Sequence, residues 1–185
     1  MTAKLISDRI FRPDEAIDHT QGPSSARVTV IEYGDFECAS CCQAHSAMKI
    51  MLAHFGRQLR FVYRHFPQRA AHPHAELAAE ASEAAAAQGK FWAFYDLLFE
   101  HQQHLEDRHL LGYARQLGLD IPRYQNEMND HVYLQRVQEH MAGGLHLDLR
   151  STPAFYVNGT VTDVSFGLHR LHEAIEQALA ALPAD

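Results

Sequence analysis

Positive charge is scarce in this chain, which has 16 lysines and arginines against 23 aspartates and glutamates. The formal net charge is -7 at pH 7 when histidine is counted as neutral. The basic residues are also scattered along the sequence, whereas a surface that binds nucleic acid carries them in clusters. We therefore expect no nucleic-acid partner.

Long apolar runs are missing as well. No stretch of about 18 uncharged apolar residues occurs, and a membrane-spanning helix needs about that many. The N-terminus, MTAKLISDRIFRPDEAIDHT, is interrupted by charged residues throughout, so it lacks the apolar core of a signal peptide. The sequence therefore predicts a cytoplasmic location and no membrane partner.

Cysteine is rare too, and the three that occur, Cys38, Cys41 and Cys42, lie within five residues of one another. An odd number of cysteines in a reducing compartment disfavours a framework of structural disulfides. Catalysis or metal binding is a better explanation for such a cluster.

What remains is the composition of one soluble globular domain, because 185 residues that are 46% hydrophobic can bury a sizeable core. The β-branched run at residues 27–33 predicts a strand, and residues 59–66 predict a second strand that Pro67 ends. Between them, apolar residues at three- and four-residue spacing predict an amphipathic helix from about Ala39. Such a unit has parallel strands and a right-handed crossover.

The middle of the chain is expected to be helical almost throughout, with the aromatic residues of its second helix, Trp92 among them, in its core. The five predicted helices cover residues 75–88, 90–101, 107–117, 123–130 and 132–147.

Strands return near the C-terminus, where Asn158 and Gly159 are the strongest short signal for a hairpin between residues 154–157 and 160–164. A closing amphipathic helix is expected over residues 167–182. The order of elements therefore predicts a single α/β domain, with a central mixed four-stranded β-sheet flanked by helices and an inserted all-helical subdomain.

The cysteines fall at the junction between the first strand and the helix. A thiol on the first helical turn, as predicted for Cys38, faces unpaired backbone N–H groups and the positive end of the helix dipole, both of which favour the thiolate. Cys41 lies three residues further on the same face, close enough to attack a mixed disulfide at Cys38 and release the partner. The alternative is that both are only buried small apolar residues.

Four segments together resemble the DsbA-like family of the thioredoxin superfamily: residues 22–41, 66–102, 117–120 and 151–159. Their order, with a helical insertion between them, is highly specific, although each motif alone is weaker. The resemblance implies a thioredoxin fold in one domain, residues 1–185, whose parts are an N-terminal arm (1–18), the thioredoxin-fold core (19–70 and 150–182) and the helical insertion (71–149).

The resemblance also implies a thiol:disulfide oxidoreductase in which Cys38 is the attacking thiol and Cys41 the buried resolving thiol. No bound cofactor is required. The expected partners are protein or low-molecular-weight thiol and disulfide substrates, together with an unidentified redox partner.

Two further positions match the family. Thr152 and Pro153 correspond to the segment with the family's cis-proline, which lies beside the disulfide and engages the substrate chain. The alternative for Pro153 is a simple strand edge. Glu32 occupies a position where some DsbA proteins have a buried acid, and could accept a proton from Cys41. A surface-facing glutamate is an equal alternative.

Departures from the family leave two questions open. The dipeptide between the cysteines is Ala39-Ser40, where the family commonly has proline first, so the sequence does not decide whether the protein oxidises, reduces or isomerises its partners. Cys42 is either a small buried side chain that packs against the sheet or a second resolving thiol one turn from Cys38.

Two competing classes of function follow from the same residues. Cys38, Cys41 or Cys42, and His45 lie on one helical face and could bind zinc or copper(I), although their geometry is poor for a closed site. We expect no metal site. His45 is expected to be an exposed helix residue, most of the 14 histidines to be solvated on polar helical faces, and His72 and His74 to be structural.

The other class is a redox-inactive thioredoxin-fold module that holds an extended peptide beside Pro153.

Overall fold

The computed structural model describes residues 10–14 and 16–182, so much of the predicted N-terminal arm, residues 1–18, lies outside the described residues. The chain folds into two compact units, each assembled from separate segments. The sheet unit comprises Met1–Tyr33, Ser46–Arg64 and Pro153–Asp185, and the helical unit comprises Gly34–His45 and His65–Thr152.

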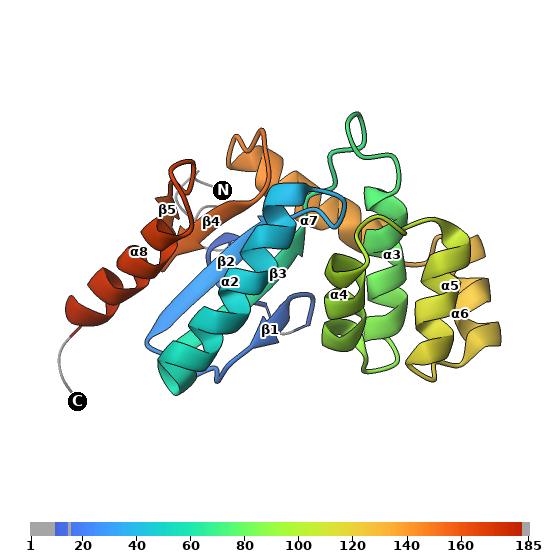
Figure 1. Ribbon diagram of the computed structural model, residues 1–185, viewed down its shortest axis with the longest axis horizontal. Coiled ribbons are helices and arrows are strands. Elements are labelled where there is room, and N and C mark those ends of the chain that lie inside the picture. Colours follow the sequence, from blue (N-terminus) through green and yellow to red (C-terminus); the bar gives the residue numbers. More distant parts are fainter. Residues whose placement is uncertain (1–9, 15, 183–185) are drawn as a thin grey trace. The chain divides into compact units, whose positions relative to one another are not determined.

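The strands in the described residues form one five-stranded sheet in the order β1-β3-β2-β4-β5 (Figure 1). Their bounds are β1 His19–Gln21, β2 Val28–Gly34, β3 Leu59–His65, β4 Ala154–Val157 and β5 Thr160–Thr162. The pairs β1–β3, β2–β4 and β4–β5 are antiparallel. Neighbours β2 and β3 are joined through helix α2 (Ala39–Phe55) and the short 3-10 helix η1 (Gly56–Gln58), the kind of crossover that parallel strands need.

The predicted mixed sheet is confirmed, but the predicted number of four strands was wrong. The missed strand is β1, a three-residue edge strand with the sequence His-Thr-Gln. It was missed because it contains no apolar residue, so hydrophobic periodicity gives no signal for it.

The C-terminal hairpin forms where Asn158 and Gly159 predict it. Both residues have positive φ, 46° and 82°, as a two-residue type I′ turn requires. The Asn158 side chain also accepts a hydrogen bond from the backbone N–H of Thr29 at 2.8 Å, which fixes the turn against β2. Strand β5 ends at Thr162, two residues earlier than predicted, and helix α8 (His169–Ala180) packs on β4 and β5.

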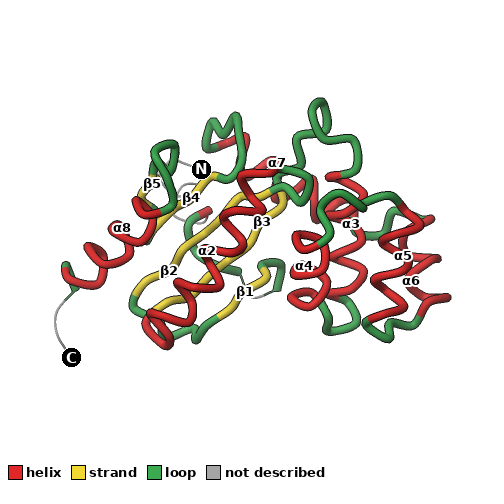
Figure 2. Tube along the Cα trace, in the orientation of Figure 1, coloured by secondary structure: helices red, strands yellow, loops and turns green. Residues whose placement is uncertain are grey.

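The helical unit contains the helices α3 Ala75–Ala86, α4 Phe91–Glu100, α5 Asp107–Gln116, α6 Ile121–Asn129 and α7 Leu134–His146 (Figure 2). Helix α3 contacts the other four. It can do so because its buried positions are mostly alanine, whose small side chain allows close approach of neighbouring helices. The predicted all-helical insertion is confirmed.

Two details of the insertion differ from prediction. Helix α6 begins at Ile121, two residues before the predicted start at 123, because Asp120 caps it and Pro122 is tolerated in the first turn. Trp92 is only half-buried and packs edge-on against Phe91 and Tyr95 rather than filling the core.

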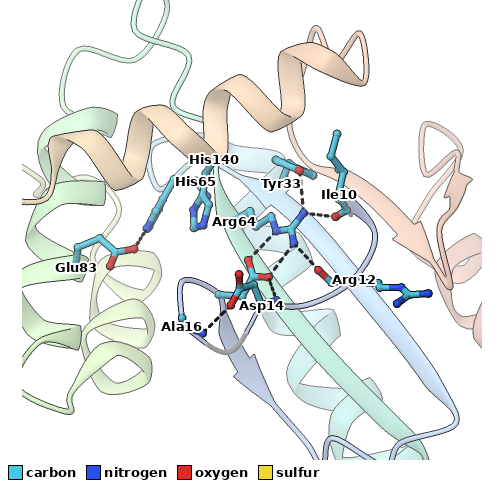
Figure 3. Close-up of polar contacts among 10 residues, drawn as sticks. Ile10, Arg12, Asp14, Ala16, Tyr33, Arg64, His65, Glu83 and His140 are labelled. Carbon is cyan, nitrogen blue, oxygen red and sulfur yellow. Dashed lines mark hydrogen bonds and ion pairs between the residues drawn. The ribbon is translucent and has the colours of Figure 1, made fainter. Parts of the chain in front are cut away.

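A buried arginine ties the start of the described chain to the sheet unit. Arg64 on β3 donates to both carboxylate oxygens of Asp18, at 2.7 and 2.8 Å. The same guanidinium reaches the Tyr33 hydroxyl at 3.1 Å and the backbone carbonyls of Ile10 and Arg12 (Figure 3). The Arg64 and Asp18 side chains are 8% and 0% exposed. Burying this charge is tolerable because its donors are matched by acceptors.

Replacement of Asp18 by asparagine should lower the free energy of unfolding by about 3–5 kcal/mol, because it leaves the Arg64 charge buried without its counter-ion. Urea denaturation of the purified protein measures the change. The matched control is Glu173→Gln, which breaks an exposed ion pair with Arg170 and should cost less than about 1 kcal/mol. Equal losses in the two variants would contradict this account of Arg64.

Candidate active site

The reactive sulfur predicted from sequence lies at the start of α2. Cys38 directly precedes the helix, and its carbonyl accepts the backbone N–H of Cys42 at 3.1 Å, so it occupies the N-cap position. Ala39 and Ser40, between the two thiols of the pair, are exposed. The first-turn N–H groups of Ser40 and Cys41 are therefore available to the Cys38 sulfur rather than to a preceding turn of helix.

Hydrogen-bond donors around Cys38 stabilise its thiolate. The largest effect is a hydrogen bond from the Cys41 side chain, which with smaller contributions from Thr152 and the backbone N–H groups of Cys41 and Ser40 lowers the pKa of Cys38 to about 5. Partial burial opposes the shift but is outweighed. Cys38 is half-buried and reachable, whereas Cys41 is fully buried. One thiol is thus exposed to a partner and the other is sheltered behind it.

Thr152 lies at the reactive sulfur, since the Cys38 thiol is 3.4 Å from the Thr152 carbonyl oxygen, to which it can donate. The structure therefore brings Cys38, Cys41 and Thr152 together within the helical unit. Pro153 follows Thr152 directly and precedes β4. Its expected cis peptide bond and its role in binding substrate stay predictions.

The third cysteine faces elsewhere. The Cys42 thiol donates to the carbonyl oxygen of Phe99 in α4, at 3.5 Å. It is partly exposed, so the interpretation of Cys42 as a buried residue that packs against the sheet was wrong. The reason is helical geometry, because adjacent positions are about 100° apart around the axis and Cys42 turns toward α4. A role as a second resolving thiol stays a prediction.

Sequence reasoning missed a glutamine that fixes the turn before α2. The side-chain amide of Gln102 donates to the carbonyl oxygens of Phe36 and Cys38, at 2.8 and 2.9 Å. Gln102 follows α4 in the chain, so a residue of the insertion holds the backbone of the reactive cysteine. No local pattern distinguishes such a glutamine, because its partners are 66 and 64 residues away.

The same turn is held from its other side by Asp35, which is buried. Its carboxylate accepts the backbone N–H groups of Glu37 and Gln68, at 2.8 and 2.7 Å, and Nδ1 of His72 lies 2.8 Å away. Partial burial lowers the pKa of His72, but the hydrogen bond and charge of Asp35, aided by the negative charge of Cys38, raise it overall. When protonated, His72 adds positive charge near the thiolate.

His74 forms a similar pair with Glu37, whose carboxylate accepts the backbone N–H of His74 at 2.7 Å and faces its Nδ1 at 3.1 Å. The expectation that His72 and His74 serve a structural role agrees with these contacts.

His45 is not exposed, contrary to expectation. It is 5% exposed, stacks on Phe99 with ring centroids 5.1 Å apart, and places Nε2 2.7 Å from Asp96 Oδ1. Burial is tolerated because the carboxylate satisfies the imidazole. No cysteine belongs to the groups with metal-ligand spacing found among the described residues. The cysteine and histidine metal site is therefore not favoured.

Two other histidines of the helical unit are also exceptions to the expected solvated position. His65 Nε2 lies 2.9 Å from Glu83, and its backbone N–H donates to Nδ1 of His140 at 3.2 Å (Figure 3). Both rings are buried.

Glu32, in the sheet unit, is fully buried within β2. The alternative of a surface-facing glutamate was wrong. Its role as a proton acceptor for Cys41 stays a prediction.

Within residues 10–14 and 16–182, no helix combines the length and the apolar character that crossing a membrane requires.

The mixed sheet, the helical insertion and the dithiol at a helix start define a thioredoxin-fold protein of the DsbA-like kind. Sequence comparison agrees, because the family described as "Thioredoxin" (Thioredoxin_4) matches residues 15–177. The chain belongs to this family, and the predicted membership of the thioredoxin superfamily is confirmed.

Individual proteins extend the comparison. A thioredoxin-like oxidoreductase from Silicibacter pomeroyi DSS-3 superposes with a TM-score of 0.81 at 27% identity, covering 95% of this chain and 98% of its own. The alpha-DsbA1 of Wolbachia pipientis shares the fold, with a TM-score of 0.77, 18% identity and coverage of 96% and 100%. The first likeness, at 27% identity, supports an oxidoreductase in general terms, and the second shows the fold alone.

The curated relatives are longer. The chain is 44% identical over 146 residues to the Na(+)/H(+) antiporter NhaA of Herminiimonas arsenicoxydans, covering 79% of this chain and 23% of the relative. It thus spans about a quarter of the length of the curated relatives that it matches.

Loss of the Cys41 thiol should raise the pKa of Cys38 from about 5 toward the ordinary thiol range, because the hydrogen bond from Cys41 is the largest cause of the shift. Thiolate absorbance followed against pH in Cys41→Ala and Cys41→Ser separates the causes. Serine keeps a donor and should retain more of the shift than alanine. A midpoint near 5 in both variants would show that Cys41 does not stabilise the thiolate.

Proposed function

We propose that this protein is a thiol:disulfide oxidoreductase whose reactive pair is Cys38 and Cys41. The observation that carries the proposal is the Cys38 sulfur at the start of α2, where its pKa is lowered to about 5. At neutral pH such a thiol is a thiolate, which is the form that attacks and leaves in disulfide exchange. A purely structural cysteine, or a module without redox turnover, has no need of this environment.

In the proposed reaction the disulfide form, with Cys38 bonded to Cys41, accepts two electrons from a substrate dithiol. A substrate thiolate attacks Cys38, the Cys38–Cys41 bond breaks and Cys41 leaves as a thiolate that takes up a proton. The second substrate thiolate then attacks the substrate sulfur of the mixed disulfide and releases the Cys38 thiolate. In reverse, Cys38 attacks a substrate disulfide and Cys41 resolves the mixed disulfide. No bound cofactor is required in either direction.

The direction proposed is oxidation of the substrate. Every donor that stabilises the Cys38 thiolate stabilises the reduced protein relative to its disulfide, and this makes the disulfide a stronger oxidant. The donors at Cys38, namely the Cys41 side chain, Thr152 and two backbone N–H groups, all act this way.

Protein or small-molecule thiols are the proposed substrates, and the Thr152-Pro153 segment is the proposed docking edge. The Thr152 carbonyl lies 3.4 Å from the Cys38 sulfur, and an extended chain can bond to backbone groups at such a position.

The relatives support one class of partner. Several curated proteins named Na(+)/H(+) antiporters contain a segment 42 to 44% identical to this chain. We propose that this domain acts on, or beside, an antiporter of that kind, in the same chain or in a separate one. The expected cytoplasmic location stays part of the proposal.

Substitution of Cys38 by serine should abolish oxidation of a reduced, unfolded substrate protein, since no sulfur then remains to form the mixed disulfide. Cys41→Ser has no Cys38–Cys41 disulfide to transfer and should be inactive in the same assay, but with a disulfide-bonded substrate its Cys38 should form the mixed disulfide and stop there. Cys42→Ser should keep activity within about twofold because its sulfur faces Phe99. Disulfide formation in the substrate, followed by thiol titration, measures all three.

Full activity in Cys38→Ser would rule the mechanism out. Equilibration of the wild type with glutathione buffers measures the reduction potential of the Cys38–Cys41 pair, which decides the direction of the reaction. A potential less negative than about -230 mV agrees with an oxidant, and one near the roughly -270 mV of thioredoxin means a reductant.

A Cys41→Ser variant expressed in cells should accumulate mixed disulfides with the disulfide-bonded form of its natural substrates, because Cys38 attacks the substrate disulfide, one substrate thiolate leaves, and the thiol that would resolve the new bond is missing. Mass spectrometry of the trapped species identifies them, and an antiporter among them supports the proposed partner. The Cys38→Ser variant is the control, since it cannot form the bond. Trapped proteins that never include an antiporter would leave the exchange reaction intact but refute this partner.

A further inference from the structure

A group of three metal-ligand side chains lies in the helical unit, outside the dithiol. His104 comes from the loop after α4, Glu106 is the N-cap of α5, and His109 is in the first turn of α5. One donor atom from each side chain lies within 4.8 Å of the other two. Glu106 Oε2 is 2.6 Å from His109 Nδ1, and the rings of His104 and His109 meet edge to face with centroids 4.9 Å apart.

The backbone that presents these side chains is fixed. The N–H of His104 donates to the carbonyl of His101 at 2.8 Å, and its own carbonyl accepts the hydroxyl of Tyr113 at 2.9 Å. Leu105 is buried, and the N–H of His109 donates to the Glu106 carbonyl at 2.7 Å. The backbone at these positions is therefore ordered before any ion arrives, which lowers the ordering cost of binding.

We propose that His104, Glu106 and His109 bind one divalent late transition metal ion, with zinc as the representative. Bonds of about 2.0–2.1 Å in a tetrahedral site place ligand atoms about 3.4 Å apart. The ligand atoms of the three side chains lie within 4.8 Å of one another, so small rotations of these side chains can bring the atoms to that spacing. Solvent supplies the fourth ligand.

The ligand types decide which ions are bound. Two imidazoles and one carboxylate suit zinc, copper and nickel, whereas magnesium and calcium prefer sites made of oxygen ligands.

Two features with positive charge oppose binding of the ion. The N-terminus of α5 carries the positive end of its dipole, and Arg108 Nη2 lies 4.0 Å from Glu106 Oε1. The Arg108 side chain is 77% exposed, so it can turn into solvent when the ion binds. Removal of its charge should therefore tighten binding, while loss of either imidazole should weaken it.

Zinc titration by calorimetry tests the site in the Cys38→Ser/Cys42→Ser background, where the remaining buried Cys41 cannot chelate alone. One zinc ion per chain is expected. His104→Ala or His109→Ala should weaken binding by about tenfold or more, and Arg108→Gln should strengthen it. His146→Ala, an exposed histidine of α7, is the matched control and should leave binding unchanged.

Cobalt(II) provides a second readout, since a site of nitrogen and oxygen ligands gives a visible spectrum without thiolate charge-transfer absorption. Zinc binding that needs the substituted cysteines, or that survives both His104→Ala and His109→Ala, would overturn the proposal. So would a loss of affinity in His146→Ala as large as in the ligand variants.

Discussion

The turn between β2 and α2 is the constraint on which the site depends, and the carboxylate of Asp35 holds it. Three groups from separate parts of the helical unit bond to this one buried side chain: the backbone of Glu37, the backbone of Gln68 and the ring of His72. Gln102 holds the carbonyls of the same turn. A thiolate at a helix start is stabilised further when the first N–H groups face it, and these bonds keep the turn in that geometry.

Much of this could be predicted from the sequence because its signals are local. The β-branched run of β2, the helical spacing of α2 and the Asn158-Gly159 turn each report on a few neighbouring residues, and each was placed within about two residues. The positions of Cys38 and Cys41 relative to one another could be predicted for the same reason, since three residues along a helix fix their geometry. Their role as a reactive pair stays a proposal.

The rest depends on contacts between residues far apart in the chain. His45 looked like an exposed helix residue because its partner, Asp96, is 51 residues away. The polar strand β1 is defined by its register with β3 and by nothing in its own composition. The contacts of Gln102 also depend on residues far along the chain, and so does the direction in which Cys42 points. Hydrophobic patterns identify buried faces, but they carry no information about which polar groups will meet inside.

The division of the chain shows what the insertion contributes. The compact unit built from α3 to α7 also includes Gly34–His45, so it contains all three cysteine thiols, while the remainder of α2 belongs to the sheet unit. The carbonyl of Thr152, the amide of Gln102 and the imidazole of His72 are in the same unit as the sulfur. The helical insertion is thus the immediate environment of the Cys38 sulfur, and a substitution of Gln102 in the loop between α4 and α5 also changes the turn that carries this sulfur.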